Sequence, residues 1–101
     1  KIIVLTPQSF INHTNHLINE YIGDNEDIIV IEGGQTRNDT LINSVNYIDE
    51  NFGIDDDSII VTHDSVRPFV THRIIEDNIE AAKRYGACDT VVPATFLFSL
   101  Y

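Results

Sequence analysis

The chain has 101 residues, enough for one small domain with a core of its own, and its hydrophobic content of 43% argues against disorder. Sixteen acidic residues against six basic ones give a net charge of −10, which disfavours nucleic acid and membrane surfaces as partners because both are anionic. The single cysteine, Cys88, excludes an internal disulfide and a cysteine-based zinc site, and it fits a cytoplasmic location.

The first half of the chain alternates two strand patterns with two helix patterns. Residues 1–7 and 28–31 hold continuous apolar runs, which predict two short buried strands. From residue 9 or 10 to Ile22, apolar side chains recur on one helical face. A second helical stripe from Leu41 to Phe52 predicts a helix that ends at Gly53, with its N-cap at Asn38 or Asp39.

The second half continues this alternation. Residues 59–62 are predicted to form a third strand, and Thr71 is a suitable N-cap for a third helix that ends at Gly86. Residues 89–93 predict the beginning of a fourth strand. The order β-α-β-α-β-α-β with short connections predicts an α/β fold, in which a mostly parallel sheet carries helices on both faces. We expect residues 1–101 to form a single domain.

A glycine-containing loop lies between the second predicted strand and the second predicted helix. Gly33 and Gly34 allow the backbone to approach a ligand closely, and the helix start that follows offers free N–H groups and a positive dipole end. Arg37 adds a cation, and Gln35 and Thr40 add groups that can read a base or a sugar. A tight turn with no ligand also explains the two glycines. The glycine spacing of a Walker A loop or a dinucleotide fingerprint is absent.

A second polar cluster follows the third predicted strand. Asp64 is a hard oxygen ligand suited to Mg²⁺, and the fork-shaped Arg67 suits a phosphate. An internal Asp64–Arg67 ion pair that pins the loop explains both residues equally well. Because both clusters follow parallel strands, we expect them to open onto the same edge of the sheet, where a nucleoside triphosphate with Mg²⁺ could bind.

Two motifs in order carry a resemblance to a known family. The patterns Gly-Gly-x-x-Arg-x-Asp-Ser/Thr and His-Asp-(Ala/Ser)-x-Arg-Pro are matched by Gly33–Thr40 and His63–Pro68. With them, the chain resembles the cytidylyltransferases that make CDP-alditols from 2-C-methyl-D-erythritol 4-phosphate or ribitol 5-phosphate. Residues Thr62–Phe69, followed by Thr71–Ile75, look more like the ribitol-phosphate branch. The resemblance extends to about Thr95.

The resemblance implies a Rossmann-like nucleotidyltransferase fold, usually a homodimer, that transfers CMP from CTP to ribitol 5-phosphate and releases CDP-ribitol and pyrophosphate. By match to the family, Gly34, Gln35 and Thr40 lie at the cytosine and ribose. Asp64 holds the Mg²⁺ cofactor near the α-phosphate, while Ser65 and Arg67 lie beside the acceptor alditol phosphate, so that Asp64 and Arg67 are the expected catalytic residues. The implied pathway is teichoic acid biosynthesis, or isoprenoid biosynthesis if the acceptor is methylerythritol phosphate.

Two parts of the family pattern are not found. The opening strand with its Leu-Ala-Gly-Gly-x-Gly-x-Arg loop is absent, and residues 96–101 match nothing in the family. We therefore expect a fragment of the enzyme, with an incomplete sheet and little or no turnover on its own. Two readings without catalysis stay open: a receiver-like Mg²⁺-binding module, although residues 1–7 lack the acidic cluster that it needs, and an inert interaction domain.

Overall fold

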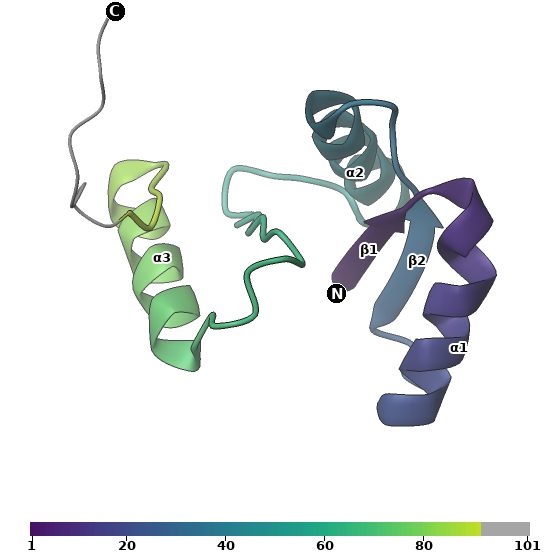
Figure 1. The fold of residues 1–101 in the computed structure, drawn as a ribbon. Coiled ribbons are helices and arrows are strands. Elements are labelled where there is room, and N and C mark those ends of the chain that lie inside the picture. Colours follow the sequence, from purple (N-terminus) through teal and green to yellow (C-terminus); the bar gives the residue numbers. More distant parts are fainter. Residues whose placement is uncertain (92–101) are drawn as a thin grey trace, which may run out of the picture. The chain divides into compact units, whose positions relative to one another are not determined.

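The computed structural model describes residues 1–91 and divides the chain into two compact units, residues 1–55 and 56–101. The first unit contains two strands, a short 3-10 helix and two α-helices, and the described part of the second contains one α-helix. Figure 1 shows these elements along the chain. That all 101 residues form one domain stays a prediction.

A two-stranded parallel sheet organises the first unit. Strands β1 (Ile2–Thr6) and β2 (Ile28–Glu32) pair in register, with Ile2 opposite Ile28 and Thr6 opposite Glu32. The connection between them runs through η1 (Gln8–Phe10) and α1 (Ile11–Tyr21), and α1 contacts β2 (Figure 1). The helix after β2, α2 (Arg37–Phe52), contacts β1. An α/β fold with parallel strands and helices is therefore confirmed.

Local sequence explains where the helices of this unit end. The Gly53 N–H donates to the carbonyls of Ile48 and Asp49 at 3.1 Å each, and its φ of 79° is a conformation that favours glycine. Gly23, which follows α1, has a φ of 91° and donates to the Ile18 carbonyl at 3.0 Å. Both glycine stops are as predicted.

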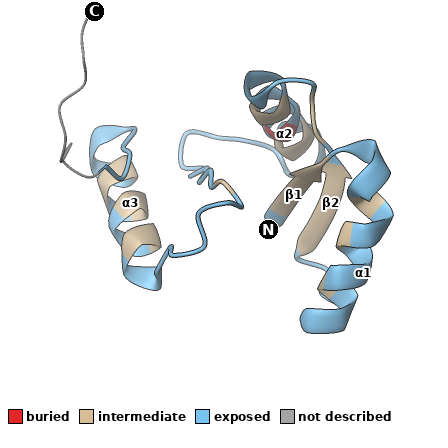
Figure 2. Cartoon of the chain, viewed as in Figure 1, coloured by how far each residue is buried: buried red, intermediate tan, exposed pale blue. Residues whose placement is uncertain are grey.

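The prediction that the two strands are buried is wrong for the described residues. Among residues 1–91 no apolar side chain is buried, and Ser44 is the one buried residue, at 8% exposure. Figure 2 shows the strands as half-buried between more exposed helices. Continuous apolar runs are buried when neighbouring strands and helices cover both faces of a sheet, and a sheet of two strands is covered only in part.

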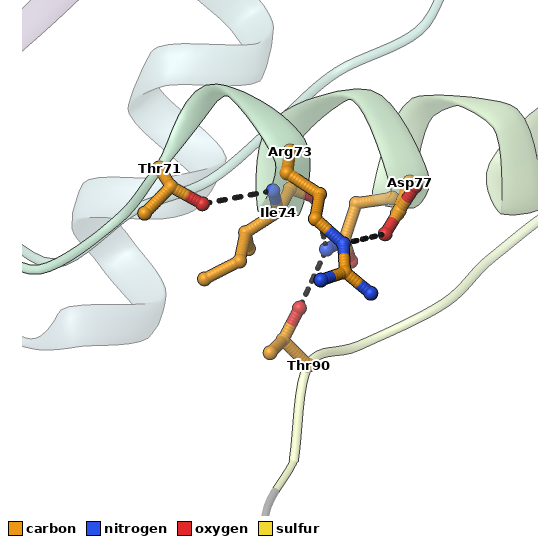
Figure 3. A network of polar contacts seen from close by, with 6 residues as sticks. Thr71, Arg73, Ile74, Asp77 and Thr90 are labelled. Carbon is orange, nitrogen blue, oxygen red and sulfur yellow. Dashed lines mark hydrogen bonds and ion pairs between the residues drawn. The ribbon is translucent and has the colours of Figure 1, made fainter.

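The second unit is described up to residue 91 and is built on α3 (His72–Tyr85). As predicted, Thr71 is the N-cap, and its hydroxyl accepts a hydrogen bond from the Ile74 N–H at 3.2 Å (Figure 3). Arg73 and Asp77 form an exposed i,i+4 ion pair at 3.6 Å on the same helix. Gly86, with a φ of 88°, ends the helix as expected.

The third predicted strand is not found. Residues 59–62 have no strand partner in the described part of the chain, and Ile59, Ile60 and Val61 are 37%, 41% and 50% exposed. An apolar, β-branched run favours extended backbone, but a strand exists only where a neighbour completes its hydrogen bonds. Of the fourth predicted strand, residues 89–91 are irregular, while residues 92 and 93 and the tail 96–101 lie outside the described residues.

An ion pair ties the beginning of β1 to the turn before β2. The Lys1 Nζ lies 2.8 Å from Asp27 Oδ1 and 5.9 Å from the centre of the Phe52 ring. The hydrogen bond from Lys1, followed by its positive charge, lowers the pKa of Asp27, and the same two contacts raise the pKa of Lys1. Both side chains are well exposed, so we expect a small contribution to stability that salt weakens.

The Lys1–Asp27 ion pair stabilises the fold only between a lower and an upper pH. Because the pKa of Asp27 is lowered in the fold, the contribution is present above the ordinary aspartate pKa, about 3.9, and is lost as the pH falls through the lowered value. Because the pKa of Lys1 is raised, the contribution is also lost as the pH rises through that raised value. We expect NMR titration to give a higher pKa for Asp27 in Lys1→Gln than in the wild type; an equal pKa would contradict the pairing.

Candidate functional site

The glycine loop begins where the two parallel strands end. The Gly33 N–H donates to the Thr6 carbonyl at 2.9 Å, so the loop leaves the sheet beside the carboxyl end of β1. Residues 33–36 then lead directly into α2. Gly33, Gly34 and Gln35 therefore lie at the carboxyl edge of a parallel sheet and at the beginning of a helix, two positions that proteins commonly use to bind phosphorylated ligands.

Gly34 is required for reasons of space. A Cβ atom at this position would lie 2.4 Å from Asp39 Cβ, 2.7 Å from the Asp39 carbonyl carbon and 2.8 Å from the Thr40 nitrogen. Gly34 is not one of the three glycines with positive φ. The loop backbone thus packs directly against the first turn of α2, which only a residue without a side chain allows.

The Thr40 side chain holds this arrangement in place. Its hydroxyl oxygen accepts a hydrogen bond from the Gly34 N–H at 2.9 Å and donates to the Thr36 carbonyl, also at 2.9 Å. Thr40, which the sequence predicts to bind the nucleotide, therefore forms its hydrogen bonds within the protein, between the glycine loop and α2.

The N-cap of α2 is Thr36, and the prediction of Asn38 or Asp39 is wrong. Thr36 has extended backbone (φ −118°, ψ 167°), and its hydroxyl accepts a hydrogen bond from the Asp39 N–H at 3.1 Å. The pattern Thr-x-x-Asp at residues 36–39 is a sequence signal for this cap. The correction places Arg37 at the first helical position, beside the positive end of the helix dipole, where an anion is favoured.

The second cluster forms a turn of its own. The Arg67 N–H donates to the Asp64 carbonyl at 3.0 Å, which closes a four-residue turn with Ser65 and Val66 at its centre. The Arg67 Nε lies 3.5 Å from Asp64 Oδ2, with the two side chains 77% and 42% exposed. The internal ion pair considered from the sequence is thus present.

The Asp64–Arg67 ion pair does not exclude that these two side chains bind a ligand. Exposed ion pairs are worth at most about 1 kcal/mol, so exchanging the contact for a cation on Asp64 and a phosphate on Arg67 costs little. Ser65 and His63 are exposed in the same segment. The turn therefore presents a carboxylate, a guanidinium and a hydroxyl within four consecutive residues.

Each predicted cluster is local to one unit. Gly33, Gly34, Gln35, Arg37 and Thr40 belong to the first unit, and Asp64, Ser65 and Arg67 belong to the second. Within each unit the structure brings the predicted residues into one short segment. That the two segments act on one ligand remains a prediction.

Comparison with models of protein families shows to which family the chain belongs. The family model described as IspD, 2-C-methyl-D-erythritol 4-phosphate cytidylyltransferase, matches residues 1–96, a span that contains both motifs. The chain belongs to this family. The IspD family uses CTP and a sugar phosphate, and it includes the ribitol-5-phosphate cytidylyltransferases, so the predicted resemblance is confirmed at the level of the family.

Two further observations bear on this IspD-family chain. Of the helices in the part of the chain that the structure describes, none has the length and apolarity needed to cross a bilayer. Within residues 1–91 no group of three or more histidine, cysteine or acidic side chains is placed to hold a metal. Mg²⁺ does not need such a group, because it usually keeps several waters and takes one or two carboxylates together with substrate phosphates. Asp64 can supply such a carboxylate.

Proposed function

We propose that the chain carries the CTP-binding and CMP-transfer motifs of a cytidylyltransferase that acts on ribitol 5-phosphate. The observation that carries the proposal is the family match over residues 1–96, which includes both motifs. In the reaction, an oxygen of the alditol phosphate attacks the α-phosphorus of CTP. The bond between the α-phosphorus and the oxygen that bridges to the β-phosphorus breaks, CDP-ribitol forms, and pyrophosphate leaves with that oxygen.

The glycine loop is the proposed cytidine site. The carbonyl groups of Gly33 and Gly34, together with the Gln35 amide, are suited to read the edge of the base, whereas the N–H groups of the two glycines already donate to Thr6 and Thr40. Arg37 adds positive charge at the first position of α2, where the helix dipole also favours an anion.

The Asp64–Arg67 turn is the proposed site of charge neutralisation. Asp64 would hold Mg²⁺, which on binding neutralises phosphate charge near the α-phosphorus. Arg67 would orient and neutralise the acceptor phosphate, and Ser65 would donate a hydrogen bond to it. Positioning and charge neutralisation account for most of the catalysis of phosphoryl transfer, so no protein nucleophile is required.

Ribitol 5-phosphate is the proposed acceptor because of the residues around the second motif. Thr62 precedes the His-Asp-Ser-x-Arg-Pro segment, and Thr71-His72-Arg73 follows it, which is the variant that resembles the ribitol-phosphate branch. Methylerythritol phosphate is the second candidate, since the matching family model bears its name. A cytoplasmic homodimer is the proposed context of the reaction.

Isothermal titration calorimetry tests the nucleotide proposal. We expect the 101-residue chain to bind CTP with Mg²⁺ at least about tenfold more tightly than UTP, because the two bases differ in the donors and acceptors that the glycine loop would read. Affinity should be modest, because the net charge of −10 repels an anionic nucleotide. Equal binding of all four nucleoside triphosphates, or of none, would refute the proposal.

The rate of pyrophosphate release distinguishes the two candidate acceptors, ribitol 5-phosphate and methylerythritol phosphate. Of the six lysines and arginines in the chain, two, Arg37 and Arg67, belong to the motifs. Two cations and one Mg²⁺ offset the charge of a triphosphate and an acceptor phosphate only in part, so we expect little or no turnover from the 101-residue chain. Any release that is measured should be faster with ribitol 5-phosphate than with methylerythritol phosphate. Faster release with methylerythritol phosphate would identify that compound as the acceptor.

A further inference from the structure

The tripeptide Ile-Ile-Val occurs three times in the chain, at residues 2–4, 28–30 and 59–61. The first two copies lie in β1 and β2 and pair with each other in parallel, each residue opposite its counterpart. The third copy is exposed and has no strand partner in the part of the chain that the structure describes. A sequence that forms a paired strand twice in this chain is therefore unpaired at its third occurrence.

The hydrogen bonds between the two strands show which edge of β1 is open. At the two ends of β1, the Ile2 N–H donates at 2.7 Å and the Thr6 carbonyl accepts at 2.9 Å, both across to the side of β2. Alternate residues of a parallel strand bond to the same neighbour, so Val4 also faces β2. Ile3 and Leu5 therefore direct their backbone N–H and C=O groups to the opposite edge, which no further strand covers within residues 1–91.

The charge distribution makes this edge and the third Ile-Ile-Val run compatible with each other. The chain carries a net charge of −10, so most of its surface repels a second copy. Residues 2–19, which include β1, contain no lysine, arginine, aspartate or glutamate, and neither do residues 58–63. Two copies can thus bring these two segments together without placing like charges side by side.

We propose that two copies of this chain associate by strand exchange, in which residues 59–62 of each copy add to the β1 edge of the other as a third strand. The added strand continues the ladder of β1 and β2 and again places Ile-Ile-Val beside Ile-Ile-Val. The described part of a single chain does not pair the run with the edge, so both are available to a partner copy. Because each copy gives one run and offers one edge, the exchange closes at two copies.

The proposal uses neither motif and does not rest on the proposed function. Its failure would leave CTP binding unaffected, and calorimetry with CTP tests that function separately. It names the β1 edge and the run as the interaction surface and a second copy of this chain as the partner.

Three variants test the two halves of the surface. Ile3→Pro removes an N–H that faces the open edge and leaves the hydrogen bonds to β2, which is the position at which edge strands tolerate proline. Ile60→Lys places a charge within the run. Ile42→Lys adds the same charge at an isoleucine of α2 that is 58% exposed and belongs to neither half, so it serves as the control. Circular dichroism establishes that each variant is folded.

Sedimentation velocity over a range of concentrations measures the association. We expect the wild type to form dimers as its concentration rises, and more readily in salt, which screens the repulsion between the two acidic chains. The dissociation constant should be at least about tenfold higher in Ile3→Pro and in Ile60→Lys and within about twofold of the wild type in Ile42→Lys. A mixture of Ile3→Pro and Ile60→Lys should form heterodimers more tightly than either variant pairs with itself, because the mixture restores one intact run and one intact edge.

Amide hydrogen exchange of the wild type provides a second measurement that needs no variant. The amides of Ile3 and Leu5 should become more protected as the protein concentration rises, because a partner strand covers them. The amide of Val4 faces β2 and should keep the same protection at every concentration. This comparison decides the proposal even if Ile3→Pro does not fold.

Four results would overturn the proposal. A wild type that stays monomeric at all concentrations has no such interface. Protection of Ile3 and Leu5 that does not change with concentration would show that the same chain covers its own edge. Association that survives both Ile3→Pro and Ile60→Lys would place the interface elsewhere on the molecule. A mixture of these two variants that forms no heterodimer would show that the run and the edge do not bind each other.

Discussion

Asp64→Asn is expected to weaken the binding of CTP with Mg²⁺ by at least about tenfold, or about 1.4 kcal/mol, and to abolish the advantage that Mg²⁺ gives over CTP alone. The substitution keeps the size of the side chain and removes the negative charge that would hold the cation. The hydrogen bond between the Arg67 N–H and the Asp64 carbonyl involves only backbone atoms, so the turn itself should persist. Calorimetry with and without Mg²⁺ measures both effects.

The chain offers a closely matched control for this substitution. Asp77 also pairs with an arginine Nε, that of Arg73, at 3.6 Å compared with 3.5 Å for the Asp64–Arg67 pair. Both pairs are on the surface of the second unit. Asp77→Asn removes the same charge from the same kind of pair outside the motif, and we expect it to leave CTP binding unchanged. Equal losses in the two variants would mean that general charge, and not a metal site at Asp64, determines the affinity.

Gly34→Ala is the second substitution with a large expected effect. The added Cβ would lie 2.4 Å from Asp39 Cβ and within 2.8 Å of two backbone atoms of α2, so the loop or the first turn of the helix must move. Overpacking of this kind costs about 1–3 kcal/mol of folding free energy. We also expect CTP binding to fall below detection, because the backbone groups that would read the base are displaced. Chemical denaturation and calorimetry measure the two losses.

Two other glycines serve as controls. At Gly33 the nearest atom to an added Cβ is a side-chain atom, Thr40 Oγ1 at 3.3 Å, which can move by a few tenths of an ångström, so Gly33→Ala should be milder. Gly53 has a φ of 79° and nothing within 4 Å of an added Cβ. Gly53→Ala should therefore destabilise the fold through its backbone alone, by about 1–2 kcal/mol, and leave the CTP affinity of the folded chain unchanged. A Gly34→Ala variant as stable as the wild type would contradict the packing described here.

Some parts of the site could be predicted because their cause lies within a few residues of the sequence. The Asp64–Arg67 turn is one of these: the two residues are three apart, and a backbone bond and an ion pair form between them. The same holds for the cap of α3 at Thr71. The cap of α2 belongs here too, because the Thr-x-x-Asp pattern at residues 36–39 is a local signal for a cap at Thr36.

Other parts depend on contacts that no local pattern specifies. Residues 59–62 have the composition of a strand, but pairing is decided by which segment lies alongside, and none does so within residues 1–91. The requirement for glycine at position 34 also depends on a contact that folding creates. From the sequence, either close approach of a ligand or a tight turn explains Gly34, whereas the structure shows that the first turn of α2 takes the space of a side chain.

By itself, the amino-acid sequence determined the family, the approximate positions of the three α-helices and the glycines at which these helices end, because motif spacing, hydrophobic period and backbone preference are properties of short segments. Only the tertiary structure decided which apolar run becomes a strand, how far the strands are buried, and that the Thr40 hydroxyl is engaged with Gly34 and Thr36. Each of these depends on atoms brought together by folding, and a hydrogen bond or a packed surface exists only when both partners are in place.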